Sequence, residues 1–315
     1  MARYLSRRLL TLIPLLFLVA VIAFGLVRMT PGDPAAVVAG PDATPEQVAR
    51  IRTAMGLDRS LPVQFVDWTE RVFLHGDLGD SLVLGQPVMK VILQRAQPTL
   101  LLAIMGAFFT MLLGVPTGIF AAVRHNSWVD RVLMSGAIIG LSIPNFWLGL
   151  LLVLTFSIHW SILPPSGFVS LQDGGITSIK YLVLPGLAIG ASSAAFLARM
   201  VRSSMLDVLR QDFIRTAKAK GLRGRSVLYR HALKNAMIPP LTVIGMLVAN
   251  LASGTVIIEI VFNVPGAGRL LINSVSRRDY PVMQGVIIIT AFIYILANLI
   301  VDILYGLIDP RVRYE

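Results

Sequence analysis

Residues 205–240 read MLDVLRQDFIRTAKAKGLRGRSVLYRHALKNAMIPP, and long apolar runs lie on both sides of this basic stretch. Together with Arg202 it holds nine lysines and arginines against two aspartates. Apolar residues at helical spacing predict a first helix whose shared face carries Leu206, Leu209, Phe213 and Ala217. Gly221 marks its end, because glycine takes positive φ easily and cations favour the C-terminal end of a helix dipole.

A second helical pattern follows the glycine, through Val227, Leu228, Ala232, Leu233 and Ala236. The stretch is therefore predicted to form two helices joined at Gly221, at a membrane surface and rich in positive charge. Such an arrangement suits a membrane protein that passes force or signal to a cytoplasmic partner. An ordinary basic cytoplasmic loop is the alternative, and the pattern alone does not decide between them.

The composition indicates an all-α integral membrane protein. Of the 315 residues 55% are hydrophobic and only 14% are charged, whereas a soluble domain has roughly a quarter charged residues. There is no cysteine and the four histidines are scattered, so we expect no disulfide and no metal site. The net charge of +11 fits cytoplasmic loops that obey the positive-inside rule, and we expect no nucleic-acid partner.

Six apolar runs predict six transmembrane helices, at residues 9–27, 99–123, 132–158, 181–198, 238–258 and 282–308. Basic residues before the first run and in the loops 124–131 and 201–237 place both termini in the cytoplasm. The first run is interpreted as a retained span. A signal peptide is the alternative, but its apolar region has only about 7–15 residues.

The spans divide the chain into four parts. Residues 1–27 form the cytoplasmic N-terminus and the first span, and residues 28–98 form a periplasmic helical cap. Residues 99–308 form the transmembrane core, with a cytoplasmic coupling loop at about 201–237, and residues 309–315 form a cytoplasmic tail. In the cap, Thr44 and Gln47 predict a capping box at the start of a helix over 44–56. Further helices are predicted over 62–74 and 87–95.

Two more features concern the spans. Small residues crowd positions 186–195, which predicts that the fourth span is buried against other helices. Prolines at 116, 144 and 185 predict breaks or kinks. A short amphipathic helix with Leu270, Leu271 and Val275 is expected on the outer face.

Polar residues within the spans are candidates for a translocation path, namely Asn145, Asn250, Ser253 and Glu259. Ionisable groups in a membrane usually face a cavity or a partner. Helix-to-helix hydrogen bonds are an equal alternative for the neutral residues. For Glu259, the alternative is a carboxylate at the interface that reaches into water.

The sequence contains none of the common nucleotide-binding or hydrolase motifs. The sequence lacks the Gly-x4-Gly-Lys-Ser/Thr nucleotide loop, Gly-x-Ser-x-Gly and His-Glu-x-x-His. We therefore assign no catalytic residue, and a membrane enzyme is disfavoured. A stand-alone secondary transporter or channel is the main alternative to a coupled subunit, although it would usually show inverted repeats or a ring of filter residues.

The basic stretch resembles the cytoplasmic EAA loop of binding-protein-dependent ABC import permeases, especially the dipeptide, oligopeptide, nickel and glutathione subgroup. The resemblance covers essentially the whole chain. It rests on DFIRTAKAKGL at 212–222, RHALKNA at 230–236, PGDP at 31–34, MGLD at 55–58, GDLG at 76–79, SIP at 142–144 and RDYP at 278–281. Where the family has Glu-Ala-Ala before the glycine, this chain has Arg215-Thr216-Ala217.

The resemblance implies a type I ABC importer permease fold in the bacterial inner (plasma) membrane. It implies a heterodimer with a second, homologous permease subunit, two ATPase subunits beneath, and a periplasmic substrate-binding protein that delivers the solute. ATP and Mg²⁺ would bind the ATPase subunits, and this chain would hold no cofactor. The coupling helix would involve Ala217, Lys220, Gly221, Leu222 and Arg223. A small peptide is the expected solute, by family frequency.

Overall fold

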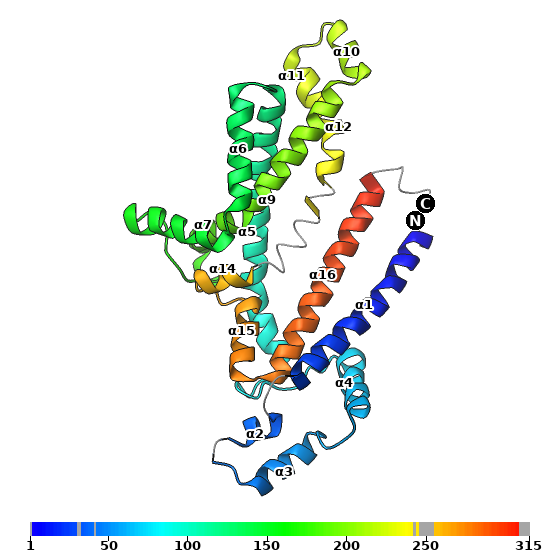
Figure 1. The fold of residues 1–315 in the computed structure, drawn as a ribbon, viewed down its shortest axis with the longest axis vertical. Coiled ribbons are helices and arrows are strands. Elements are labelled where there is room, and N and C mark those ends of the chain that lie inside the picture. The colour runs from blue at the N-terminus through cyan, green and yellow to red at the C-terminus, as the bar shows by residue number, and fades with distance from the viewer. Residues whose placement is uncertain (1, 30–32, 41, 242–243, 246–254, 309–315) are drawn as a thin grey trace. The chain divides into compact units, whose positions relative to one another are not determined.

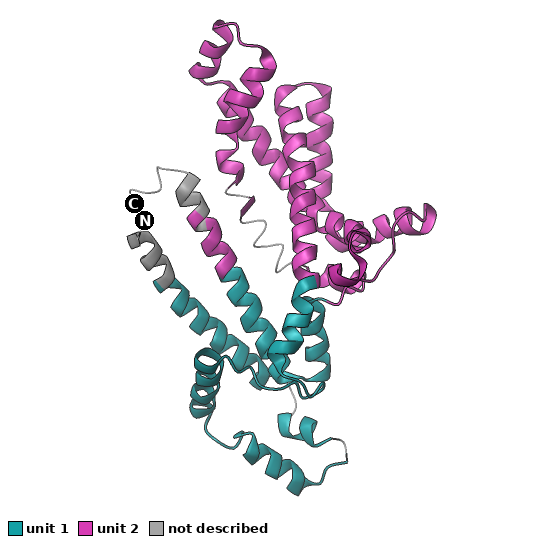
Figure 2. Ribbon diagram, turned by 180° about the vertical axis from the view of Figure 1, so that it is seen from behind, with its two compact units in different colours: residues 1–97, 266–295 teal, residues 98–265, 296–315 magenta. Residues whose placement is uncertain are grey.

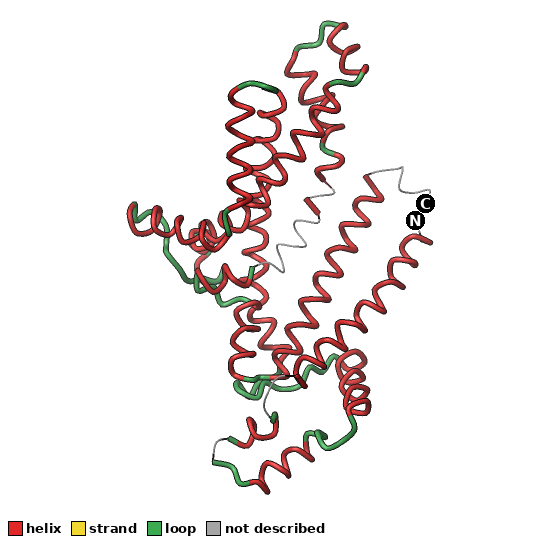
Figure 3. The backbone as a smooth tube through the Cα atoms, viewed as in Figure 1, coloured by secondary structure: helices red, strands yellow, loops and turns green. Residues whose placement is uncertain are grey.

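The computed structural model describes residues 2–29, 33–40, 42–241, 244–245 and 255–308, and these residues form helices without a strand (Figures 1 and 3). This confirms the predicted all-α class. The long helices are α1 (Ala2–Met29), α4 (Leu61–His75), α5 (Val88–Val123), α6 (Trp128–Ser142), α9 (Thr177–Leu209), α15 (Ala267–Arg277) and α16 (Tyr280–Ile308). The shorter ones are α2 (Pro34–Ala39), α3 (Pro45–Ala54), α7 (Asn145–Leu152), α8 (Leu171–Gly174), α10 (Asp212–Ala219), α11 (Gly224–Ser226), α12 (Leu233–Ala236) and α14 (Val256–Val261). Two π-helical segments are η1 (Val153–His159) and η2 (Val227–Ala232).

Four helices among the described residues are long and apolar enough to cross a membrane: Leu10–Met29 of α1, α5, α9 and Tyr280–Val301 of α16. A bent pair, Trp128–Ser142 and Asn145–His159, is a fifth candidate. The two halves of the pair meet at 105°, which confirms the predicted break of the span 132–158 at Pro144. Pro144 is the cause, because it forces the preceding Ile143 into extended backbone. Most of the predicted span 238–258 lies outside the described residues.

The local signals of the cap are confirmed. The Thr44 hydroxyl accepts from the Gln47 amide at 3.3 Å, and the Gln47 side chain accepts from the Thr44 amide at 2.8 Å, which is the predicted capping box. Helix α4 matches the predicted 62–74 and ends at Gly76 with φ +65°. An Arg52 hydrogen bond to Asp33, 2.6 Å long, holds the pKa of Asp33 below its usual value.

The prediction of a separate helix over 87–95 is wrong. Helix α5 runs without interruption from Val88 to Val123, through Pro98 and Pro116. Val91 and Ile92 are buried before Pro98, and Leu102 and Ala103 are buried after it. Packing on both sides of the proline therefore offsets the one backbone hydrogen bond that the proline removes.

The chain forms two compact units (Figure 2), and the predicted domain limits remain predictions. The first unit comprises residues 1–97 and 266–295. Its core joins α1, α4 and α16 through Ala20, Phe24, Trp68, Val72 and Ile288. The predicted amphipathic helix is confirmed as α15, whose Leu270 and Leu271 pack against buried Val282 and Val286, and its place on the outer face stays a prediction.

The second unit comprises residues 98–265 and 296–315, and its centre is the crossing of α5 and α9. A Cβ added at Gly190 would lie 2.6 Å from the Gly106 carbonyl oxygen, and one at Gly118 would lie 2.5 Å from that of Ala198. The Thr110 hydroxyl donates across the same contact to the Gly190 carbonyl at 3.2 Å. The prediction that the small residues of the fourth span pack against other helices is confirmed.

Replacing Gly190 by valine should destabilise the chain by about 3 kcal/mol, since the colliding atoms belong to the backbone of α5 and cannot rotate away. The measurement is the midpoint of thermal unfolding in detergent, read together with the monodisperse yield. Gly136→Val on α6 is the control, because nothing lies within 4 Å of its added Cβ. Equal stability of the two variants would contradict the close crossing.

Candidate functional site

Within the second unit, the basic stretch contains a sharp break after α9. Helix α9 ends at Leu209, and Gln211 is extended at φ −74° and ψ 153° before α10 begins. The predicted single helical face is therefore wrong. The break rotates α10, so that Ile214 and Ala217 are buried while Phe213 is 40% exposed.

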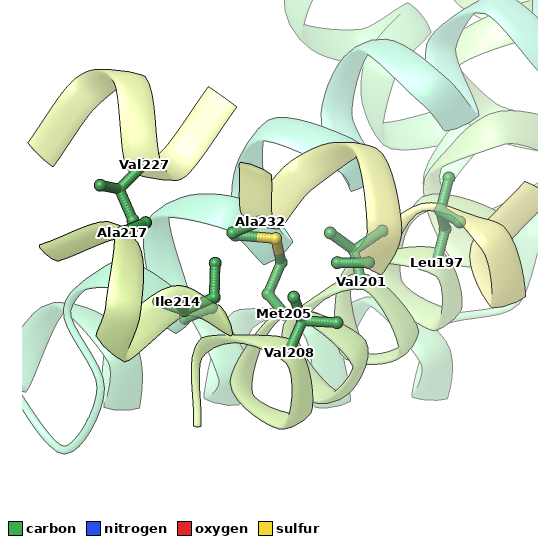
Figure 4. Close-up of a cluster of buried hydrophobic side chains, with 10 residues drawn as sticks. Leu197, Val201, Met205, Val208, Ile214, Ala217, Val227 and Ala232 are labelled. Carbon is green, nitrogen blue, oxygen red and sulfur yellow. The ribbon is translucent and has the colours of Figure 1, made fainter. Parts of the chain in front are cut away.

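A hydrophobic cluster anchors this stretch to α9. Ile214 and Ala217 of α10, together with Val227 and Ala232 of η2, pack against Met205 and its neighbours on α9 (Figure 4). The cluster residues of α9 are Leu197, Val201, Met205 and Val208. Ile214, Met205 and Ala232 are completely buried. The predicted second helix is confirmed, with a π-helical first part. One hydrophobic core therefore joins α9, α10 and η2.

Gly221 ends α10 in a Schellman motif. Its amide donates to the Lys218 carbonyl at 3.0 Å, and the Leu222 amide donates to the Ala217 carbonyl at 3.3 Å. The φ of Gly221 is +76°, a conformation that L side chains rarely adopt. The predicted helix stop is confirmed, and its hydrogen bonds satisfy carbonyls that would otherwise remain unpaired at the end of α10.

The four residues after α10 form an exposed tip, which consists of Lys220, Gly221, Leu222 and Arg223. Leu222 is 41% exposed. Of the predicted coupling residues, only Ala217 lies in the core, at 7% exposure. The tip thus combines two cations with an exposed aliphatic side chain on an anchored turn. A surface of this kind is suited to bind a groove that has acidic and apolar groups.

Arg215 occupies the place of the family's glutamate and makes only a local contact. Its guanidinium lies 3.3 Å from Asp212 of the same helix, and both side chains are highly exposed, at 75% and 93%. An exposed ion pair of this spacing contributes little to stability. The contacts that hold α10 in place therefore come from Ile214 and Ala217, one residue before Arg215 and two after it.

A buried ion pair, which sequence reasoning missed, ties α6 to α9 ahead of the basic stretch. Arg202 donates twice to Asp130, at 2.6 and 2.7 Å, and the Asn126 amide donates to the same carboxylate at 3.0 Å. His125 Nδ1 lies 3.4 Å from Asp130, whose side chain is 4% exposed. The two partners are 72 residues apart, and no local signal joins them.

The candidate path residues do not share one environment. Glu259 of α14 is completely buried, so the interpretation that it reaches water is wrong. Its carboxylate accepts from Thr99 at 2.7 Å and from Thr255 at 3.0 Å. Asn145 begins α7 and is partly exposed. Asn250 and Ser253 lie outside the described residues. Among the residues that the structure describes, no group of three His, Cys, Asp or Glu side chains could hold a metal ion.

A second buried carboxylate, also missed from the sequence, organises the first unit. Asp279 is 3% exposed and accepts from the Ser81 hydroxyl and from the Leu82 amide, the latter at 3.1 Å. It precedes α16 and so fixes the turn at 81–84 to the start of that helix. Asp279 belongs to the RDYP motif at 278–281, and Ser81 follows the GDLG motif at 76–79.

The chain is similar to known membrane transport proteins along its whole length. Residues 114–314 match the family described as binding-protein-dependent transport system inner membrane component, and residues 1–110 match the N-terminal part of such membrane components. The chain is 44% identical over 314 residues to a probable peptide ABC transporter permease protein of Sinorhizobium fredii, with 100% of both chains covered. It is also 44% identical over 315 residues to the glutathione transport system permease protein GsiC of Salmonella choleraesuis, again with 100% of both covered.

A solved structure shares the fold. An inward-facing form of the MetNI methionine ABC transporter superposes with a TM-score of 0.58 at 19% identity. The superposition covers 70% of this chain and 97% of the other.

Proposed function

The chain belongs to the family of binding-protein-dependent transport system inner membrane components, and from this premise we propose that it is one of two permease subunits of an ATP-driven importer. The second permease would be homologous, two ATPase subunits would bind and hydrolyse ATP with Mg²⁺, and a periplasmic binding protein would deliver the solute. The chain itself would hold no cofactor. It would span the bacterial inner membrane six times with both termini in the cytoplasm.

The observation that carries this proposal is the anchored, exposed tip after α10. Gly221 turns the chain so that Lys220, Leu222 and Arg223 face outward, while Ile214 and Ala217 hold α10 on the core of α9. When the ATPase subunits close, a partner bound to the tip would move α10, η2 and α9 together. That motion would open the translocation path, for which Asn145, Asn250, Ser253 and Glu259 remain candidates.

For the solute, we propose a small peptide, which includes glutathione. This rests on the names of the two full-length relatives and not on any side chain of the path. The cap, residues 28–98, would contact the binding protein. Its helix α3 has no buried residue, so its surface is open to such a partner.

The test is co-purification of the tagged chain with the products of its neighbouring genes, followed by an ATPase assay. A stable complex, whose ATP hydrolysis rises with peptide-loaded binding protein, is the expected result. Replacing residues 44–55 by a Gly/Ser linker should weaken that stimulation if the cap meets the binding protein. A chain that purifies alone and moves solute without ATP would instead be a secondary transporter.

A further inference from the structure

The first unit contains a large cavity that no part of the proposed coupling uses. It has a volume of about 830 Å³, which lies within the range of roughly 300–1,000 Å³ that is typical of small-molecule sites. Its wall is formed by the end of α1, the end of α3 with the residues that follow it (53–57), helix α4, the turn at 77–82 and the start of α16.

One side of the cavity is aromatic and cationic. Phe24 and Trp68 pack with their ring centroids 5.7 Å apart and their planes tilted by 47°, and Trp68 is 9% exposed. The Arg28 guanidinium lies 5.2 Å from the centroid of the Phe24 ring and donates to Gln64. Arg71 of α4 also lines the cavity, and it is exposed and makes no ion pair within the part of the chain that the structure describes.

Carboxylates line the cavity as well. Glu70 of α4 and Asp80 of the following turn are both exposed. Asp77 of the same turn uses one oxygen to accept from the Gly79 amide at 2.8 Å, which leaves its other oxygen for a ligand. The cavity therefore presents both signs of charge, together with an aromatic surface.

Tyr280 supplies an independent observation. Its side chain lines the cavity and is only 3% exposed, yet its hydroxyl makes no hydrogen bond to any described residue. Buried tyrosine hydroxyls ordinarily have a hydrogen-bond partner. The hydroxyl oxygen itself is covered, so a polar group of a ligand in this cavity would provide the partner once the wall beside Tyr280 shifts.

We propose that this cavity is a binding site for a short zwitterionic peptide on the permease itself. Arg71 and Arg28 would attract the peptide carboxylate, and Asp77 and Asp80 would attract its amino group. The Tyr280 hydroxyl would hydrogen-bond a polar group of the peptide, and Trp68 would contact its side chains. The inference rests on the proposed function, since it places a further contact for the same solute on the first unit of the permease.

The test measures equilibrium binding of radiolabelled trialanine and of glutathione to the full-length permease in lipid nanodiscs, without the binding protein. Arg71→Gln should weaken binding about tenfold, because it removes a charged partner. Tyr280→Phe, which removes only the hydroxyl, should weaken it about fivefold. Trialanine with acetylated and amidated termini should not compete.

Two matched controls separate the site from general damage. Arg50→Gln removes another exposed arginine, from α3, that does not line the cavity, and Tyr181→Phe removes a tyrosine hydroxyl from the second unit. Both variants should bind the labelled peptides like the unmodified chain. Thermal unfolding of all four variants checks that each one is folded.

Absence of saturable binding to the unmodified chain, or equal binding by the cavity variants and their controls, would overturn the proposal. It would also be overturned if the cavity variants kept peptide binding but lost affinity for the binding protein, since the cavity would then be a protein contact. ATP-driven peptide uptake by the assembled importer, measured in parallel, tests the proposed function separately. Uptake without cavity binding would leave that function standing and remove this site alone.

Discussion

Replacing Gly221 by aspartate is expected to abolish ATP-driven uptake while the chain remains inserted and folded. Nothing lies within 4 Å of a Cβ added at Gly221, so the new side chain meets no atom of its own chain and projects from the exposed tip. Aspartate also tolerates positive φ better than most residues. The folded chain should therefore accept the change.

The ATPase subunit that we propose binds the tip should not tolerate the aspartate. The new carboxylate would stand between Lys220 and Arg223, on the surface that we propose docks to an ATPase subunit. There it would face the acidic groups that the cations of the tip are proposed to contact, and like charges brought together in an interface cost several kcal/mol, which is about a 100-fold or greater loss of affinity. Uptake of labelled peptide by the reconstituted importer is the measurement, and membrane insertion is checked by fractionation.

Gly85→Asp is the matched control for this experiment. Gly85 also has positive φ, +61°, and open space around its added Cβ, but it lies in the turn of the first unit. It should keep at least about half of the uptake, since surface substitutions usually have small effects. Uptake by the Gly221 variant at the unmodified rate would refute the coupling assignment.

Asp130→Ala is expected to lower the free energy of unfolding by about 2–3 kcal/mol. The change leaves Arg202 without its carboxylate and the Asn126 amide without its acceptor. Removing one partner of a buried pair costs roughly 3–5 kcal/mol, and the value here should be lower because the Arg202 side chain is 26% exposed. The midpoint of unfolding in detergent measures the effect.

Two further variants show whether the loss comes from this ion pair. Asp207→Ala removes an exposed carboxylate from α9, which should cost less than about 0.5 kcal/mol. The double variant Asp130→Ala with Arg202→Ala should lose less stability than the sum of the single changes, since the two groups act together. Additive losses would mean that the contact contributes nothing.

In the basic stretch at 205–240, some features could be predicted from neighbouring residues and others could not. Its glycine stop and its second helix were predictable, because a Schellman motif and a helical pattern depend on residues within a few positions of one another. The rotation of α10 at Gln211 was not. That break turns Phe213 outward and Ile214 inward, and it depends on which side chains the core of α9 accepts.

The sequence by itself determined the helical class, the apolar runs, the capping box at Thr44 and the stops at Gly76 and Gly221, all of which depend on composition or on neighbouring residues. Tertiary structure alone decided the pairing of Asp130 with Arg202, the pairing of Ser81 with Asp279 across 198 positions, and the burial of Glu259. It also decided that α5 continues through Pro98. The physical reason is that these features require two surfaces to meet, and the energy that selects them comes from packing and from the cost of burying a polar group without a partner.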